Sequence, residues 1–486
     1  MPSSAKARTT VAAHMRSKAT KCAPPGGSTT TTTTGDGRAR VDIHITNHYA
    51  AKIYTAGASI TGEAVVRVPR DTHFDRIAVQ FAGFTATRNY MTPEISQVLH
   101  HFLLLDMPDK AAHARLPPDR FLRAGQSYTL PFHFVVPERL PIGSCCHRCE
   151  HASVREHHLR LPPTMGACWG DRDDASPETA RVQYCVSVSV LQRPVFMPEP
   201  VSILRGQHEV NVLPVGAEDA PLDIEPGDKT GEYRLAASKT LRKSLVSRKF
   251  GTVTVEAAQP SAVVLSPDAR LASQTRIALR LRFSSAARGL GETSADAGPD
   301  EASLPAIHSI TAKLIAKTYY NTSHMGAFPD RDRRTELNYG AALYYSDSSR
   351  ATDLPFDLAG GWQAQKKHEG QPSAWAATVD AALQLPTDHK RVLLPTFHGC
   401  LLSRTYTLRL VLSVGPGRTN IALSLPLQII VEGGLPAVPQ PSPARDVLGH
   451  GGADASLPSY KDHLFIQNRC EDGFDTHLPA GIRIIM

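Results

Sequence analysis

Large apolar side chains recur at every second position in many separate runs, and this period constrains the fold more than any other feature of the chain. Residues 276–283 place four such side chains on one face and three arginines on the other. Because successive side chains of a strand point to opposite faces, this pattern predicts strands with one buried face. Antiparallel sheets produce it, whereas parallel sheets covered on both faces give continuous apolar runs. The period recurs over residues 60–68, 77–81, 128–136, 182–190, 406–414 and 421–431.

The alternating runs fall into two blocks separated by a basic segment. The 486 residues include 34 glycines and 37 prolines, which suits many short strands joined by turns. We therefore predict an all-β fold of two tandem immunoglobulin-like antiparallel β-sandwiches. The predicted organisation is a disordered N-terminal tail over 1–40, a first sandwich over 41–214, a basic connector over 215–249, a second sandwich over 250–433 and a Pro/Gly-rich C-terminal tail over 434–486.

Polar segments precede and interrupt these blocks. The N-terminal tail contains six consecutive threonines and no acidic residue before Asp36, a composition that predicts disorder. Its shortage of acidic residues also resembles a mitochondrial presequence, although no amphipathic helix accompanies it. Within the second block, the polar stretches 286–304 and 321–374 are predicted to be loops.

Several short segments of the two blocks match one known family when they are taken as a set. In the first block they are Tyr54–Gly57 with Ile60–Gly62, Ile77–Gly83, Ala124-Gly125 before Pro131–Pro137 and Leu140-Pro141, and Val154–Pro163 before Val182–Tyr184. In the second block they are Phe250-Gly251, Gln259-Pro260 and Pro395–Phe397. The set resembles the arrestin-like family, in particular the α-arrestins and their fungal relatives. The resemblance implies a cytoplasmic adaptor that is recruited peripherally to the plasma membrane or to endosomes.

The predicted C-terminal tail carries a tyrosine motif that fits this resemblance. Members of the family bind membrane transporters or receptors and recruit a HECT-type ubiquitin ligase, whose WW domains bind a proline–tyrosine motif. The chain has no Pro-Pro-x-Tyr sequence, but Leu457, Pro458 and Tyr460 form the LPxY variant. Pro458 favours the polyproline II conformation that WW domains bind, and Tyr460 offers a ring for a second pocket. We expect this motif to bind the ligase for cargo ubiquitylation, endocytosis and sorting; the alternative is an ordinary turn.

The predicted connector combines positive charge with leucines at helical spacing. Its basic residues, which have no carboxylate among them, are Arg234, Lys239, Arg242, Lys243, Arg248 and Lys249. Such a segment suits an anionic lipid surface, where each charge contributes about 1 kcal/mol, and it suits a solvated helix or coil equally well. The net charge of +7 is spread over the whole chain and aromatic residues make up 6%, so we expect no nucleic-acid partner.

Cysteine and histidine are concentrated between the two halves of the first block. Residues Cys145, Cys146, His147, Cys149, His151, His157, His158 and Cys168 all lie there. Cys146 and Cys149 have the CxxC spacing that presents two thiolates to one zinc ion, and His151 and His158 are the further candidate ligands. No second CxxC follows, so a loop without metal is the alternative, and we predict no cofactor.

The sequence carries none of the common catalytic motifs. There is no phosphate loop ending in GK[ST], no HExxH and no GxSxG, and we expect the protein not to be an enzyme. No apolar run approaches the ~18 residues of a membrane-spanning helix. Two alternatives to the adaptor with a ligase stay open. One is a ligase-independent scaffold in vesicle trafficking or signalling, and the other is a zinc-dependent enzyme centred on residues 145–168.

Overall fold

The described part of the protein is built mainly from strands, most of them paired antiparallel, as the period of two predicts. The computed structural model describes residues 39–88, 97–108, 115–166, 169, 172–196, 199–219, 234–242, 249–285, 304–329, 342–346, 351–365, 374–387, 390–433 and 482–485. Within these ranges there is one α-helix, α2 (Ala152–His158), and one 3-10 turn, η1 (Ile142–Ser144). No helix of the described part of the chain has the length and apolar character needed to cross a membrane. The all-β prediction is therefore confirmed.

The N-terminal half contains two sheets that face each other as a β-sandwich. Phe81 and Phe134 lie in opposite sheets with ring centroids 6.0 Å apart, and both belong to the hydrophobic core. One sheet has the order β1 (Arg40–Ile45), β3 (Ser59–Arg67), β8 (Ser127–Val135). The other has the order β2 (Ile53–Tyr54), β10 (Val201–Val212), β9 (Ala180–Gln192), β5 (Arg76–Arg88), β6 (Gln97–Asp106), β24 (Ile482–Ile485), and a small pair joins β4 (Thr72–His73) to β7 (Phe121–Leu122).

The C-terminal half is a second pair of sheets with buried inner faces. One sheet has the order β11 (Arg234–Arg242), β12 (Lys249–Ala258), β14 (Gln274–Ser285), β19 (Ala374–Gln384), β18 (Phe356–Ala364). The other has the order β16 (Ala342–Ser346), β15 (Ile307–Tyr320), β21 (Leu402–Val414), β20 (Phe397–His398), with β17 (Thr352–Asp353) on β15 and β22 (Thr419–Leu427) on β21. A parallel pair joins β13 (Val263–Leu265) to β23 (Ile429–Val431).

Strand β14 shows how the sequence period becomes a buried face. Its residues alternate between exposed and buried from Gln274 to Phe283, and the side chain of Phe283 is 1% exposed. The arginines between the apolar positions lie on the exposed face, as predicted. Burial of an aliphatic or aromatic side chain stabilises the fold by about 1.5–3 kcal/mol, so the pattern specifies which face of the strand turns inward.

The two halves repeat one strand order. In the N-terminal half β1 pairs with β3 and β3 with β8, and in the C-terminal half β12 pairs with β14 and β14 with β19. The opposite sheets likewise run β10–β9–β5–β6 and β22–β21–β15–β16. In each half the last strand also forms a short parallel pair with an earlier strand, β10 with β2 and β23 with β13.

The repeat extends to single hydrogen bonds. Tyr184 of β9 donates its hydroxyl to the Pro162 carbonyl at 2.6 Å, and Tyr406 of β21 donates to the Leu394 carbonyl at 2.7 Å. Thr164 exchanges hydrogen bonds with Val212, as Thr396 does with Ile429. These pairs occupy equivalent places in the two strand orders.

Part of the predicted connector is a strand. Residues 215–249 were predicted to be a connector, and the spacing of their leucines indicated a helix. Arg234–Arg242 is instead strand β11, which pairs with β12 along its length. Leu241 of β11 is fully buried, and its Cδ1 atom lies 2.9 Å from the ideal Cβ position of Gly415, at the end of β21 in the opposite sheet. The helical interpretation is therefore wrong for this segment, because contacts across the sandwich determine its conformation.

Two further segments predicted to lack regular structure contain strands. The polar stretch 321–374 includes β16, β17 and β18, and β18 forms the edge of its sheet. At the end of the chain, β24 adds a parallel edge strand to β6, with Ile482 opposite Gln97. The predicted tails 1–38 and 434–481 and the insert 286–303 lie outside the described residues.

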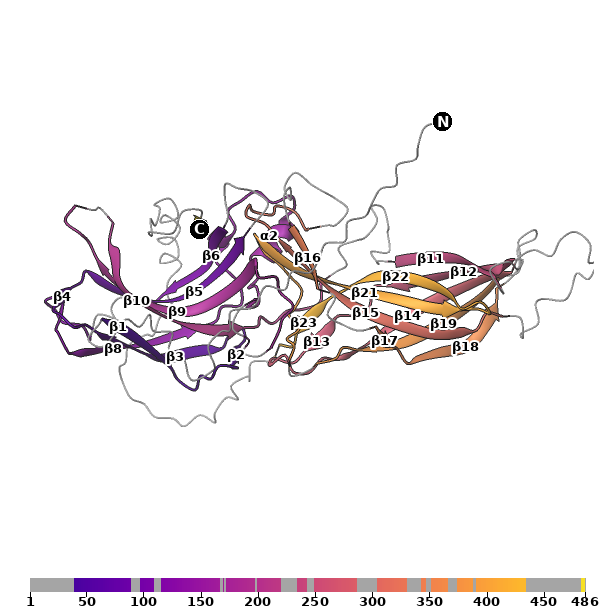
Figure 1. Cartoon of the computed structure of the whole chain (residues 1–486), viewed down its shortest axis with the longest axis horizontal. Helices are drawn as coiled ribbons and strands as arrows, with labels where there is room; N and C mark the ends of the chain where they lie inside the picture. Colours follow the sequence, from indigo (N-terminus) through magenta and orange to yellow (C-terminus); the bar gives the residue numbers. More distant parts are fainter. Residues whose placement is uncertain are drawn as a thin grey trace, which may run out of the picture.

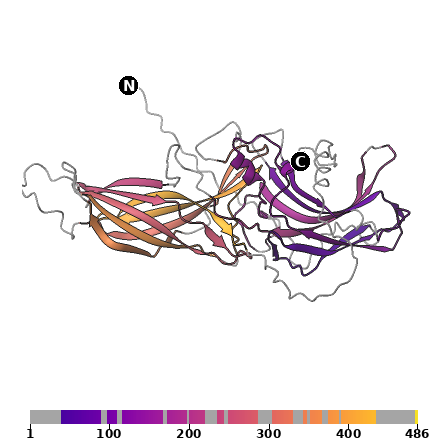
Figure 2. The same ribbon diagram turned by 180° about the vertical axis from the view of Figure 1, so that it is seen from behind.

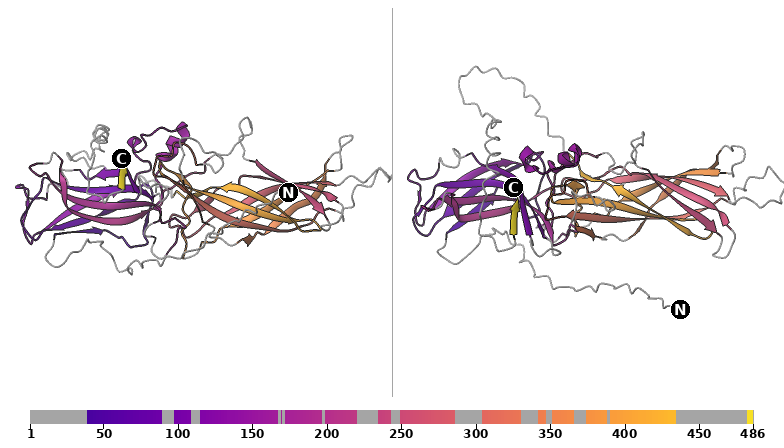
Figure 3. Two further views of the ribbon diagram at one scale, coloured as in Figure 1. Left: turned by 45° about the horizontal axis from the view of Figure 1, so that its top comes forward. Right: turned by 90° about the horizontal axis from the view of Figure 1, so that it is seen from above.

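The halves lie end to end along the long axis of the molecule (Figure 1). Strands β1–β10 occupy one end and β11–β22 the other, and helix α2 lies where they meet, as the view from behind also shows (Figure 2). Strand β24 lies against the N-terminal half when the molecule is seen from above (Figure 3). The junction between the halves is the place where residues far apart in the sequence meet.

Candidate functional site

The residues predicted to bind a ligase or a lipid surface do not form one site in the described structure. Leu457, Pro458 and Tyr460 lie outside the described residues. Lys239, Arg242 and Lys249 are exposed on the pair β11–β12, and Arg234 begins β11. Lys243 and Arg248 lie outside the described residues. The metal candidates, by contrast, lie at the junction.

A loop between β8 and β9 presents the cysteines and histidines. The loop is closed at its base by an antiparallel bridge between Arg139 and Arg160 and by a hydrogen bond from Leu140 N to Leu159 O at 2.8 Å. Cys145 follows η1 directly and is buried, while His158 ends α2 and is also buried. The short helix thus brings His158 back toward Cys145.

The C-terminal half supplies a further cysteine to this loop. Cys400 lies in the turn between β20 and β21, which is closed by a hydrogen bond from Gly399 N to Leu402 O at 2.9 Å. Met325 N donates to the Cys400 carbonyl at 2.7 Å, and the Cys400 thiol lies 3.9 Å from the Ser144 carbonyl. The turn therefore contacts the end of η1 directly.

Four side chains converge here, and we call them the Cys/His cluster: Cys145, His147, His158 and Cys400. Their ligand atoms all lie within 4.8 Å of one another. The Cys145 sulfur is 3.5 Å from His147 Nε2 and 3.6 Å from His158 Nδ1. His147 Nδ1 is 3.1 Å from the Arg148 carbonyl, and the His147 ring stacks on that of His324 at 4.5 Å.

The electrostatics of the cluster favour one thiolate. The neighbouring Cys400 thiol, followed by His147 and His158, lowers the pKa of Cys145. The same contact with Cys145 raises the pKa of Cys400, and burial raises it further. The pKa values of the two sulfurs are therefore shifted in opposite directions, down for Cys145 and up for Cys400.

The structure places the four sequence-based metal candidates differently. His158 belongs to the cluster, and Cys149 lies beside it with its sulfur 3.8 Å from that of Cys145. Cys146 turns away, because its exposed thiol donates to the Gly143 carbonyl at 2.9 Å, and His151 is exposed next to Glu150. Cys400 was missed, since nothing in the order of the sequence places it near residue 145.

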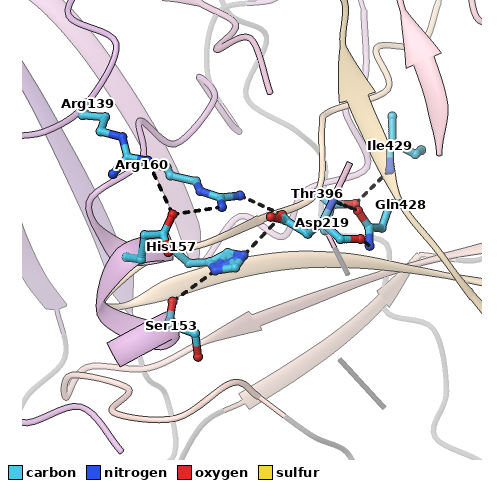
Figure 4. A network of polar contacts seen from close by, with 9 residues as sticks. Arg139, Ser153, His157, Arg160, Asp219, Thr396, Gln428 and Ile429 are labelled. Carbon is cyan, nitrogen blue, oxygen red and sulfur yellow. Dashed lines mark hydrogen bonds and ion pairs between the residues drawn. The ribbon is translucent and has the colours of Figure 1, made fainter. Parts of the chain in front are cut away.

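A second group of polar contacts crosses the junction at Asp219 (Figure 4). The Asp219 carboxylate accepts a hydrogen bond from Arg160 at 2.7 Å and lies 3.3 Å from His157 Nε2. On the other side, the Asp219 backbone exchanges two hydrogen bonds with the Gln428 side chain, at 2.8 and 2.6 Å. The hydrogen bond that Arg160 donates to Asp219 raises the pKa of Arg160. Burial lowers the pKa of His157 to about 4. Arg160 also forms an ion pair with Glu156, so its guanidinium lies between two carboxylates, and the imidazole of His157 beside them is neutral.

A buried arginine forms the third polar contact. Arg404 of β21 is 1% exposed, and its guanidinium donates to the carbonyls of Asp174 and Ala175 at 3.0 and 3.3 Å. It also donates to the Ser176 hydroxyl at 3.0 Å. These acceptors belong to the segment just before β9, so the buried guanidinium of Arg404 ties the C-terminal half to the N-terminal half, while its Nε has no hydrogen-bond partner among the described residues.

A scan of the chain against protein-family models finds no match, and a search of curated proteins finds no match either.

Proposed function

We propose that the chain is an arrestin-like adaptor that links membrane transporters or receptors to a HECT-type ubiquitin ligase. Its two halves act as tandem immunoglobulin-like domains that hold cargo, and the LPxY motif holds the ligase. The protein acts in the cytoplasm, is recruited to the plasma membrane or endosomes, and carries out no catalysis itself. Holding both partners on one chain raises their effective concentration toward each other, which favours ubiquitylation of the cargo.

The observation that carries this proposal is the repeated strand order. Two consecutive sandwiches with the same pairing, and with equivalent tyrosine and threonine hydrogen bonds, are what a tandem arrangement of one domain type requires. The polar contacts of Arg404 and Asp219 join them into one extended platform. Such a platform suits binding of partners over a large surface.

The ligase contact is tested with the full-length chain and the isolated WW domains of a HECT-type ligase. The wild type is expected to bind. The Pro458→Ala/Tyr460→Ala variant is expected to lose at least about tenfold in affinity, because it lacks both the proline that favours the polyproline II conformation and the aromatic ring of the tyrosine. Isothermal titration calorimetry measures the difference. Pro479→Ala is the matched control, since Leu478-Pro479 repeats the Leu-Pro pair without a tyrosine.

Equal binding by the wild type and the double variant would contradict the ligase contact. The repeated fold would then support the ligase-independent scaffold, which predicts unchanged cargo turnover when Tyr460 is replaced. Cargo turnover in cells that express each variant separates the two functions.

Recruitment to membranes has two candidate surfaces. The turn between β9 and β10 projects from the N-terminal half and exposes Val195 and Phe196, which are 93% and 96% exposed (Figure 1). The exposed basic residues Lys239 and Lys249 lie in the other half. Insertion of two apolar side chains contributes more than two surface charges, so the β9–β10 turn is expected to dominate.

Vesicle co-sedimentation compares these surfaces. Val195→Asp/Phe196→Asp is expected to reduce binding to vesicles of phosphatidylcholine and phosphatidylserine at least about tenfold, whereas Lys239→Glu/Lys249→Glu reduces it less. Leu271→Asp is the control, because Leu271 is also an exposed apolar residue, at 69% exposure, but lies in the C-terminal half. A larger loss with the lysine variant would show that the basic pair is the principal contact.

A further inference from the structure

We propose that Cys145, His147, His158 and Cys400 bind one zinc ion that holds the two halves of the protein together. Three of these residues lie in the loop between β8 and β9, and the fourth lies in the turn between β20 and β21. This inference is independent of the adaptor function, because it rests on the geometry of the cluster alone.

The spacing of the ligand atoms matches a tetrahedral zinc site. Zn–S bonds of about 2.3 Å and Zn–N bonds of about 2.0–2.1 Å place a sulfur and a nitrogen about 3.5 Å apart in a tetrahedron. The Cys145 sulfur lies 3.5 Å from His147 Nε2 and 3.6 Å from His158 Nδ1. The four atoms all lie within 4.8 Å of one another, so small movements of the side chains bring them to the spacing of one tetrahedral ion.

The surroundings of His147 are those of a metal ligand. Its Nδ1 donates to the Arg148 carbonyl at 3.1 Å, so the proton sits on that nitrogen and the lone pair of Nε2 points at the cluster. Zinc-bound histidines characteristically donate their other ring nitrogen to a carbonyl or carboxylate in this way. The ring of His324 stacks on His147 with an interplanar angle of 6° and fixes its orientation.

Charge and burial favour zinc over the hard cations. Two thiolates and two neutral imidazoles around Zn²⁺ give a site without net charge, which can be buried at little electrostatic cost. Cys145, His158 and Cys400 are buried, and a tetrahedral S₂N₂ set selects zinc. Because all four positions are filled by protein, no coordination site stays open for a substrate, and the ion has a structural role.

Cys400 is a better fourth ligand than Cys149. The Cys149 sulfur is 3.9 Å from His158 Nδ1, but it approaches His147 at Nδ1, the nitrogen that bonds to Arg148. Cys149 is also partly exposed, whereas Cys400 is buried against η1. With Cys400 as a ligand, the coordination bonds of zinc connect the two halves. With Cys149 in its place, all four ligands would lie in the loop between β8 and β9, and the ion would not connect the halves.

The test is the metal content of the full-length protein, purified from medium supplemented with zinc and dialysed against a weak chelator. Inductively coupled plasma mass spectrometry is expected to find about one zinc per chain in the wild type and at least about fivefold less in Cys400→Ser. Cys146→Ser and Cys149→Ser are matched controls from the same loop and are expected to keep the ion. Retention by Cys400→Ser with loss from Cys149→Ser would overturn the link between the halves.

The unaltered chain gives a measurement that does not depend on how a variant folds. Addition of Co²⁺ to metal-free wild type is expected to produce the visible bands of tetrahedral cobalt together with a thiolate charge-transfer band. Zinc added afterwards is expected to abolish both. A wild-type protein that holds no zinc and gives no such spectrum would refute the site.

Discussion

Replacement of Arg404 with alanine is expected to lower the free energy of unfolding by about 3–5 kcal/mol. The guanidinium is among the largest fully buried side chains of the described structure, and it satisfies the carbonyls of Asp174 and Ala175 and the hydroxyl of Ser176. Alanine leaves the buried Asp174 carbonyl and the half-buried acceptors of Ala175 and Ser176 without this donor, and it opens a cavity between the halves. Urea unfolding of the full-length chain, followed by tryptophan fluorescence, measures the loss.

Arg409→Ala is the matched control for this prediction. Arg409 lies in the same strand, β21, but is exposed, so its loss is expected to change stability by less than about 0.5 kcal/mol. Calorimetry adds a second readout: with the contact of Arg404 removed, the two halves are expected to unfold in separate transitions. Equal unfolding midpoints for the two arginine variants would show that the buried contact does not stabilise the junction.

The second large effect is expected at Gly62, where two strands approach closely. An ideal Cβ atom on Gly62 would lie 2.1 Å from the backbone oxygen of His44 and 2.7 Å from the ring of Phe132. The oxygen belongs to β1, which pairs with β3, so the clash is relieved only if the two strands separate. Gly62→Ala is therefore expected to cost about 3 kcal/mol, at the upper end of the range for overpacked sites.

Gly216→Ala is the control for the glycine prediction. A Cβ atom on Gly216 meets nothing within 4 Å, so the change is expected to be neutral within about 0.5 kcal/mol. The midpoint of thermal unfolding compares the two variants. If Gly62→Ala unfolds at the wild-type temperature, the close approach of β1 and β3 is not needed for stability.

The polar contacts between the two halves bear on the adaptor proposal, because they hold the halves in one relative placement. The Cys/His cluster, Asp219 and Arg404 all lie where the two halves meet, and each joins residues that are far apart in the sequence. Buried polar contacts of this kind specify a relative placement more sharply than apolar packing does, because an unpaired polar group in the interior is costly. The proposed platform, on which both halves hold cargo, needs such a placement.

Local pattern was sufficient for the strands whose apolar residues keep a clear period of two. The alternation in β14 and β21 predicted which residues are buried, because the period of two follows directly from strand geometry. The local pattern failed at β11, where the spacing of leucines such as Leu235 and Leu241 indicated a helix. The burial of Leu241 depends on packing at Gly415, which no local window contains.

The candidate metal site shows the same division. Cys145, His147 and His158 lie in one short segment, and their residue types alone made the loop a candidate for metal binding. The CxxC spacing favoured Cys146, but the backbone after η1 turns that thiol toward Gly143. Side-chain direction within a loop follows from its hydrogen bonds and not from residue spacing, so the ligand set could not be chosen from the sequence.

The sequence by itself therefore determined the all-β class, the inward faces of the strands with a clear period of two and the segment rich in cysteine and histidine. Only the tertiary structure decided that β11 is a strand, that the two halves repeat one pairing order and that Cys400 meets Cys145. The reason is physical: strand period and residue chemistry are properties of neighbours along the chain. The partner of a buried thiol or guanidinium is set by packing between segments that the sequence keeps far apart.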